Sequence, residues 1–213
     1  MLRELLSPRT TLDAFFEVHL PALHARHADR FAAFFQEPVR VEAYLEEDPA
    51  QRWYLVASGA GLEVSRWPSH QEVDVVVAFT HAGWSSMRTF LADFRSELEA
   101  LVERDPPRPK APIDRATWRR ACAGGVEVRA RMVDAPDDSH PSVVVRLTGS
   151  APTPSLVQIE VDCLTVEDLL SETMTLREAL APSVLRVSGD VGVLPRMASV
   201  LAPLWPQRRG GRR

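Results

Sequence analysis

One strand pattern occurs twice in this chain, 87 residues apart, and it constrains the fold more than any other feature of the sequence. Residues 39–43 read VRVEA and residues 126–130 read VEVRA, so apolar and charged residues alternate in both segments. A period of two is typical of a strand with one buried and one solvated face. The sequence therefore predicts two similar half-buried strands, one in each half of the chain.

Further strands and a helix are predicted after each of these two strands. The expected strands are short apolar runs bounded by turn residues: 53–57, 62–67 and 73–79 in the first half, and 143–147 and 156–164 in the second. Thr80 is predicted to cap a helix that ends near Leu101, and Thr165 opens a capping-box pattern at the corresponding place. We predict a degenerate repeat of helix, three or four antiparallel strands and helix; chance similarity of two α+β segments is the alternative.

Four other segments complete the expected elements. Residues 11–36 carry apolar residues at helical spacing, and Pro21 is expected to kink or split this helix because it lacks a backbone N–H. A short helix is predicted over residues 114–123 and a strand over residues 184–188. A last helix is predicted from Pro195 to Leu204, with proline at its first position.

A proline-rich segment separates the two halves. Residues 105–112 read DPPRPKAP, and four prolines in eight residues favour a stiff, extended linker. We therefore predict an N-terminal unit over residues 1–104, the linker, a C-terminal unit over residues 113–206 and a flexible, arginine-rich tail over residues 207–213. The predicted fold class is α+β, with an antiparallel sheet or sheets, helices packed on one face and two repeated halves.

Composition argues for a globular protein whose partners are not nucleic acids. The 213 residues are 45% hydrophobic and carry a net charge of −4, whereas nucleic-acid binders present many cations to phosphates. No apolar run approaches the ~18 residues that span a membrane, and the first residues lack a secretory pattern. We expect a cytoplasmic protein of bacterial origin, the latter because Lys110 is the only lysine and arginine usage indicates a GC-rich genome.

No residue pattern predicts catalysis or metal binding. His24 and His27 share one helix face and His19 lies nearby, but no acidic residue stands at ligand spacing, so a solvated helix face explains them. Cys122 and Cys163 form no C-x-x-C pair, and Cys163 is predicted to be a small buried hydrophobe in an apolar run. We therefore predict no enzyme activity, no metal and no cofactor.

An apolar helix and a strand that runs into Gly-Asp mark the C-terminal half. Residues 165–170 read TVEDLL and residues 184–190 read VLRVSGD, with three strands before them and an amphipathic helix after them. In this order of elements, residues 126–205 resemble the sterol carrier protein 2 (SCP2) family of lipid-binding domains, and residues 11–101 look like a second, truncated copy. The resemblance implies a five-stranded sheet, helices on one face and an apolar tunnel for fatty acyl or sterol-like ligands.

The resemblance implies a ligand under the last helix. The expected lining residues are apolar and follow the strands: Leu169, Leu170, Met174, Leu180, Met197, Leu201 and Trp205. The predicted function is non-enzymatic binding of an apolar small molecule, although the same side chains would equally fill a core. The alternative is a protein-interaction or dimerisation module with a filled core, which binds a partner protein or a second copy through apolar faces around Trp53, Trp67 and Trp84.

Overall fold

The computed structural model describes most of the chain between Leu2 and Pro195. The described residues are 2–7, 9–68, 72–103, 114–121, 124–134, 141–147, 154–171, 173–174, 176–179 and 184–195. The predicted linker, the predicted tail and the predicted last helix beyond Pro195 lie outside these residues. The division of the chain into two units therefore stays a prediction.

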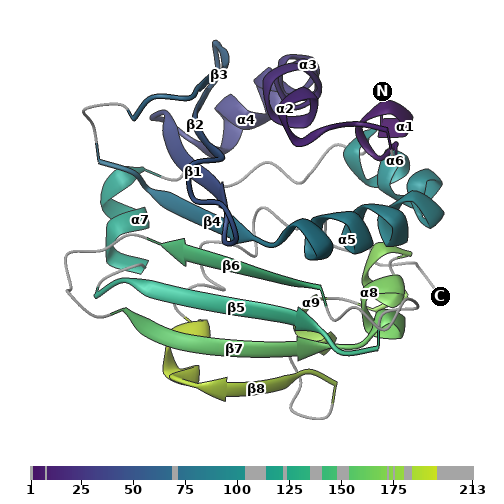
Figure 1. Ribbon diagram of the computed structural model, residues 1–213. Coiled ribbons are helices and arrows are strands. Elements are labelled where there is room, and N and C mark those ends of the chain that lie inside the picture. The colour runs from purple at the N-terminus through teal and green to yellow at the C-terminus, as the bar shows by residue number, and fades with distance from the viewer. Residues whose placement is uncertain are drawn as a thin grey trace, which may run out of the picture.

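Strands from both halves form one mixed sheet. They are β1 Val39–Leu45, β2 Arg52–Ser58, β3 Gly61–Ser65, β4 Val75–Phe79, β5 Val126–Met132, β6 Ser142–Leu147, β7 Ser155–Val161 and β8 Arg186–Gly189. Their order is β3-β2-β1-β4-β6-β5-β7-β8, and they stack in that order from top to bottom in Figure 1. Neighbours are antiparallel except β1–β4 and β5–β7, which are parallel. The predicted α+β class is confirmed, and the mostly antiparallel sheet contains two parallel pairs.

The helices fall before, between and after the strand groups. They are α1 Leu2–Leu5, α2 Leu12–Ala14, the π-helix η1 Phe15–His19, α3 Leu20–Arg26, α4 Ala28–Phe34, α5 His81–Asp93, α6 Arg95–Glu103, α7 Arg115–Ala121, α8 Cys163–Leu170, α9 Leu176–Ala179 and the 3₁₀ turn η2 Val191–Val193. Figure 1 shows α5, α6 and α8 together at one end of the sheet.

The helix predicted over residues 11–36 is divided into several segments. Leu20 donates its N–H to Phe15 O, five residues back, immediately before Pro21. Pro21 has no N–H to continue the ordinary ladder, so a wider π-turn precedes it. The chain stays helical through Pro21, so the predicted split does not occur there, and the ladder changes from π to α instead. The break lies at His27, whose backbone has φ −124° and ψ 18°, and it was not predicted.

The helices pack on one apolar face of the sheet, as predicted. Trp53 of β2 is fully buried and stacks on Phe16 of η1 with ring centroids 4.5 Å apart. Leu45 and Phe79 lie in the same cluster. A second cluster under the C-terminal half contains Val126, Leu147, Val157 and Val193, with Trp118 of α7 against it.

The opposite face of the sheet carries paired charges. Glu127 of β5 is buried and accepts hydrogen bonds from Arg146 at 2.6 Å and from Arg129 at 2.7 Å. Burial alone would raise the pKa of Glu127, but these hydrogen bonds outweigh it and lower the pKa below 4.5. On the same face, Glu42 and Arg52 lie 2.7 Å apart. The alternation predicted for both strand segments therefore places the apolar residues on the face that the helices cover and the charged residues on the opposite face.

The two halves share one strand arrangement. In each, the first strand has an antiparallel partner on one side and a parallel partner on the other, as in β2-β1-β4 and β6-β5-β7. Backbone hydrogen bonds recur at matching places: Leu45 N to Gln51 O (3.2 Å) and Met132 N to Pro141 O (2.9 Å), then Glu46 N to Phe79 O (3.0 Å) and Val133 N to Val161 O (3.1 Å). The structure thus shows a shared topology, while a repeat in the sequence stays a prediction.

A carboxylate beyond the first strand also caps the helix that follows in each half. Glu47 Oε1 accepts a hydrogen bond from His81 N at 2.9 Å. Asp134 Oδ1 accepts one from Cys163 N at 2.6 Å. Both donors are at the first position of their helix, where an N–H has no partner within the helix.

The start of α8 corrects one sequence prediction. Asp162 is the capping residue and its carboxylate accepts from Thr165 N at 2.6 Å, while Thr165 itself is buried inside the helix. Strand β7 ends at Val161, so Cys163 belongs to the helix and not to a strand. Two carboxylates, from Asp134 and Asp162, reach this helix end, which explains why it begins earlier than the capping-box pattern indicated.

Gly189 ends β8 in a conformation that other residues rarely adopt. Its φ is +89°, and a Cβ atom there would lie 2.2 Å from Leu156 O. That carbonyl also accepts a hydrogen bond from Asp190 N at 2.9 Å. Both the dihedral angle and the close approach of the backbone therefore require glycine.

We predict that Gly189→Ala lowers the free energy of unfolding by roughly 3 kcal/mol, because it adds a steric clash to an unfavourable φ. Gly124→Ala is the matched control, since Gly124 has φ +87° with nothing within 4 Å of the added Cβ. It should cost about 1 kcal/mol. Urea denaturation measures both, and equal losses would contradict the steric argument.

His24 is a partly buried titratable group within the helical layer. Neither of its ring nitrogens has a hydrogen-bond partner within the described structure, and its ring lies 5.0 Å from that of Phe31. Burial lowers the pKa of His24 below 6.5. Below pH 6.5 the imidazole of His24 is protonated in the unfolded chain but remains neutral in the folded protein. The free energy of unfolding therefore decreases as the pH falls from 6.5 towards the lower pKa of the folded state.

We predict that His24→Phe reduces this acid sensitivity, since the ring contact with Phe31 is kept and the titration is removed. Urea midpoints at pH 7.5 and 5.0 should differ less for the variant than for the natural protein. The idea fails if both proteins lose the same stability between these two pH values.

Candidate functional site

The structure describes three of the seven predicted ligand-binding residues. Leu169 and Leu170 are half-buried on α8, and Met174 is half-buried after it. Leu170 packs against the cluster formed by Phe90 and Met132. The remaining four predicted residues lie outside the described part of the chain: Leu180, Met197, Leu201 and Trp205.

The apolar face of β5, β6 and β7 forms a strip beside these residues. We call it the C-terminal apolar strip; its members point to the helix-covered face and are all half-buried: Val128, Ala130, Val143, Val145, Ile159 and Val161. Met132 is paired with Val161 across the parallel β5–β7 ladder. Because Leu170 packs on the Met132 cluster, the strip reaches the predicted site residues of α8.

The matching positions of the N-terminal half are filled by aromatic rings. Trp53 pairs with Ala43 of β1, as Val143 pairs with Ala130 of β5. Phe79 and Val161 likewise occupy matching places beside Leu45 and Met132.

The two halves therefore differ in how deeply the side chains at these positions are buried. Ala43, Trp53 and Phe79 are all buried, at 2%, 0% and 7% exposure. The residues at the matching positions of the C-terminal apolar strip are half-buried. They are Ala130, equal in size to Ala43, and Val143 and Val161, which are smaller than Trp53 and Phe79. At these positions the N-terminal half is buried and the C-terminal half is partly accessible. At the other end of the same strands the order is reversed, since Val126, Leu147 and Val157 are buried and the matching Val39, Ala57 and Val75 are half-buried.

Soft, polarizable side chains border the strip. Cys163 Sγ lies 3.2 Å from Met132 Sδ and 3.3 Å from Asp134 O. Met87, Val166 and Leu170 pack on the same cluster. Thioethers and thiols adapt to irregular apolar shapes. Cys163 was predicted to be a small buried hydrophobe; it is half-buried and its Sγ donates to Asp134 O.

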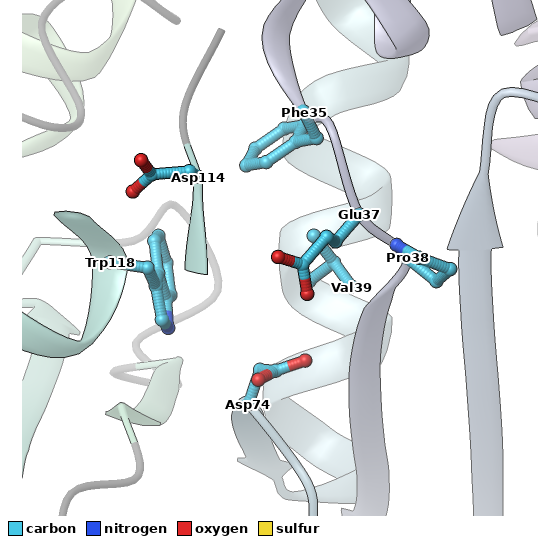
Figure 2. A pocket seen from close by; sticks show the side chains of 7 residues that line it. All are labelled: Phe35, Glu37, Pro38, Val39, Asp74, Asp114 and Trp118. Atoms are coloured by element: carbon cyan, nitrogen blue, oxygen red, sulfur yellow. The ribbon is translucent and has the colours of Figure 1, made fainter. Parts of the chain in front are cut away.

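A small cavity lies where β1, β4 and α7 meet, next to the second core cluster (Figure 2). Its volume is about 20 Å³, which is room for one water molecule and not for an acyl chain. Figure 2 shows Asp114 and Trp118 on one side and Phe35 and Glu37 on the other, with Asp74 below them. Asp114 caps α7 through Thr117 N at 2.6 Å, which lowers the pKa of Asp114.

The described residues contain neither a metal site nor a membrane span. Within them, no cluster of three or more His, Cys, Asp or Glu side chains is arranged to hold a metal ion. In the same part of the chain, no helix combines the length and the apolar character needed to cross a membrane.

The three tryptophans expected at a protein interface have different surroundings. Trp53 is fully buried in the core, so this part of the interface prediction is wrong. Trp84 is half-buried and its ring lies 4.5 Å from that of Phe15. Trp67 is 78% exposed and remains available to a partner.

Comparison with known proteins assigns no family to this chain. No protein-family model matches the sequence, and no curated protein or solved structure matches it significantly. The sterol carrier protein 2 resemblance therefore stays a prediction.

Sequence reasoning missed the strip itself. Its residues were predicted as strand residues, and their alternation indicated one buried face. That these residues are smaller and less buried than Trp53 and Phe79 at the matching positions could be seen only once the strand register had aligned the two halves.

Proposed function

We propose that this protein is a non-enzymatic binder of an apolar small molecule, a fatty acyl or sterol-like lipid. The observation that carries the proposal is the C-terminal apolar strip, where Ala130, Val143 and Val161 are half-buried while the matching Ala43, Trp53 and Phe79 are sealed. An apolar ligand laid on this strip would remove its remaining surface from water.

Burial of the ligand supplies the affinity. Each methylene transferred from water contributes about 0.8 kcal/mol. Ten buried methylenes correspond to roughly 8 kcal/mol, the free energy of a micromolar complex, before the cost of ordering the chain. No charged partner is needed for such binding, which agrees with an apolar lining of valine, isoleucine, leucine and methionine.

The predicted residues on α8 and directly after it belong to the same proposal. Leu169, Leu170 and Met174 would flank the ligand at the end of the strip, and the segment after Pro195 would cover it. Met132 and Cys163 would adjust to ligands of different shape because their side chains are soft.

We predict that Val143→Trp, which copies Trp53 of the other half, weakens binding of a fluorescent fatty acid at least tenfold by occupying the strip. Val144→Trp is the matched control, because Val144 is the next residue of β6 and points to the opposite face. Fluorescence titration measures the affinity, and thermal unfolding verifies that both variants fold. Absence of saturable uptake by the natural protein, or equal loss in both variants, would count against the proposal.

A protein contact is the second candidate function, and Trp67 carries it. This side chain is 78% exposed, two residues after the edge strand β3. Exposed aromatic side chains beside an edge strand favour association with another chain.

We predict that Trp67→Ala shifts an oligomer towards the monomer in sedimentation velocity if this face mediates association, while fatty acid uptake stays unchanged. A natural protein that sediments as a monomer at all concentrations would refute self-association through this face.

A further inference from the structure

The edge of the sheet at β3 carries few of the features that prevent pairing with another chain. β3 is the first strand in the order of the sheet, at the top of Figure 1, and among the described strands it pairs with β2 alone. Sheet edges are commonly protected by proline, lysine or a bulge. β3 reads GLEVS, and its register with β2 is continuous from Gly61 to Ser65, so it has none of these three. The strand at the other end of the order, β8, is shorter and begins with an arginine.

The outward backbone groups of β3 belong to Leu62 and Val64. In an antiparallel ladder, successive residues direct their N–H and C=O groups to opposite sides of the strand. The odd-numbered residues of β2 face β1, since Gln51 O accepts from Leu45 N at 3.2 Å. The even-numbered residues of β2 therefore pair with the odd-numbered residues of β3. This leaves the N–H and C=O groups of Leu62 and Val64 directed away from the sheet.

Trp67, beside this edge, is presented by an anchored segment. Ser65 Oγ accepts from Trp67 N at 3.0 Å and donates to Trp67 O at 3.2 Å. Between them, Arg66 is ion-paired with Glu17 at 2.6 Å, and its guanidinium carbon lies 4.5 Å from the ring centroid of Trp53. These contacts fix the backbone before any partner arrives, so association does not have to order it.

The two ends of the edge are complementary to each other. Trp67 is 78% exposed at one end. At the other end, a Cβ atom added to Gly61 would meet nothing within 4 Å, so the space beside it is open. A two-fold axis at Val64 would pair two copies of β3 antiparallel and place each Trp67 beside Gly61 of the other copy. Such an interface uses the same patch on both subunits, as most homodimers do.

The side chains favour this register over its neighbours. With Val64 opposite its own copy, Glu63 lies opposite Ser65, and both are exposed. A shift in one direction would place Glu63 opposite Glu63, and like charges at that position are destabilising. A shift in the other direction would place Trp67 opposite Glu63 and leave Gly61 uncovered.

We propose that the partner at this surface is a second copy of this chain, joined by antiparallel pairing of the two β3 edges with Val64 at the two-fold axis. The two sheets then continue into one. The inference rests on the second candidate function, the protein contact through Trp67, and names its partner and register. A short ladder and one aromatic side chain per copy make a small interface, so the dimer is weak and its population depends on concentration.

Val64→Cys tests the register by disulfide formation. Residues that face each other in an antiparallel ladder have Cα atoms about 4.5–5.5 Å apart, within the range that a disulfide spans. Mild oxidation should therefore link the variant into a dimer, and peptide mass spectrometry should find the new bond at residue 64. Val41→Cys is the matched control, because Val41 is half-buried against the same core cluster but lies in an interior strand. The natural chain gives the background from Cys122 and Cys163.

A second pair of variants avoids the core. Glu63 and Ser65 are both exposed. When Glu63→Cys and Ser65→Cys are mixed, they should link to each other more than either links to itself. Trp67→Ala, added to Val64→Cys, should reduce the rate of linkage about tenfold, since an exposed aromatic anchor is lost. Thermal unfolding verifies that each variant folds.

The outcomes separate the pairing from the contact itself. If the natural protein sediments as a dimer that Trp67→Ala dissociates, but Val64→Cys links no better than Val41→Cys and the mixed pair shows no preference, the β3 pairing is overturned and the Trp67 contact stands. A dimer that Trp67→Ala leaves intact, or a monomer at all concentrations, overturns both. Fatty acid uptake is unaffected by any of these outcomes, because it is measured at Val143.

Discussion

The pairing of β4 with β6 is the interaction on which the rest of the structure depends. It joins two strand groups into one sheet, with Val75 beside Leu147 and Phe79 beside Val143. Without it, β4 would be an unpaired edge and the second core cluster would lose Val75. Both the sealed N-terminal face and the C-terminal apolar strip are therefore parts of one continuous surface that the helices cover.

A shared backbone arrangement with different side chains gives the two halves different properties. Trp53 and Phe16 stack in the N-terminal half and close its apolar face, which is the ordinary, densely packed solution. In the C-terminal half, Val143 and Val161 leave the matching positions half-buried. Each half thus has a buried core at one end of its strands, and the C-terminal half also keeps half-buried apolar positions near Met132.

Much of the strand layout could be predicted from the sequence, because alternation reports directly on which face of a strand is buried. The parallel pairing of β4 with β1 could not be predicted, since the strand beside which β4 lies depends on contacts between residues far apart in the sequence. The start of α8 was misplaced because Asp134, a residue outside the local pattern, helps to cap it. The burial of Trp53 was also missed, because Phe16 covers it from a distant helix. Of the described candidate site, Leu169, Leu170 and Met174 were predicted from the sequence. The strip was not, since it becomes visible only through the register of the strands.

The central position of β4 has a consequence for synthesis on the ribosome. Its partner strand β6 lies far downstream, with Leu147 72 residues after Val75. At about 5–20 residues per second, β6 emerges roughly 4–14 s after β4. During that interval a Val-Val-Val-Ala-Phe strand without charge exposes one edge, the kind of segment that joins other chains into aggregates. The edge of β4 in the nascent N-terminal half is thus open to pairing with other chains until the second strand group is synthesised.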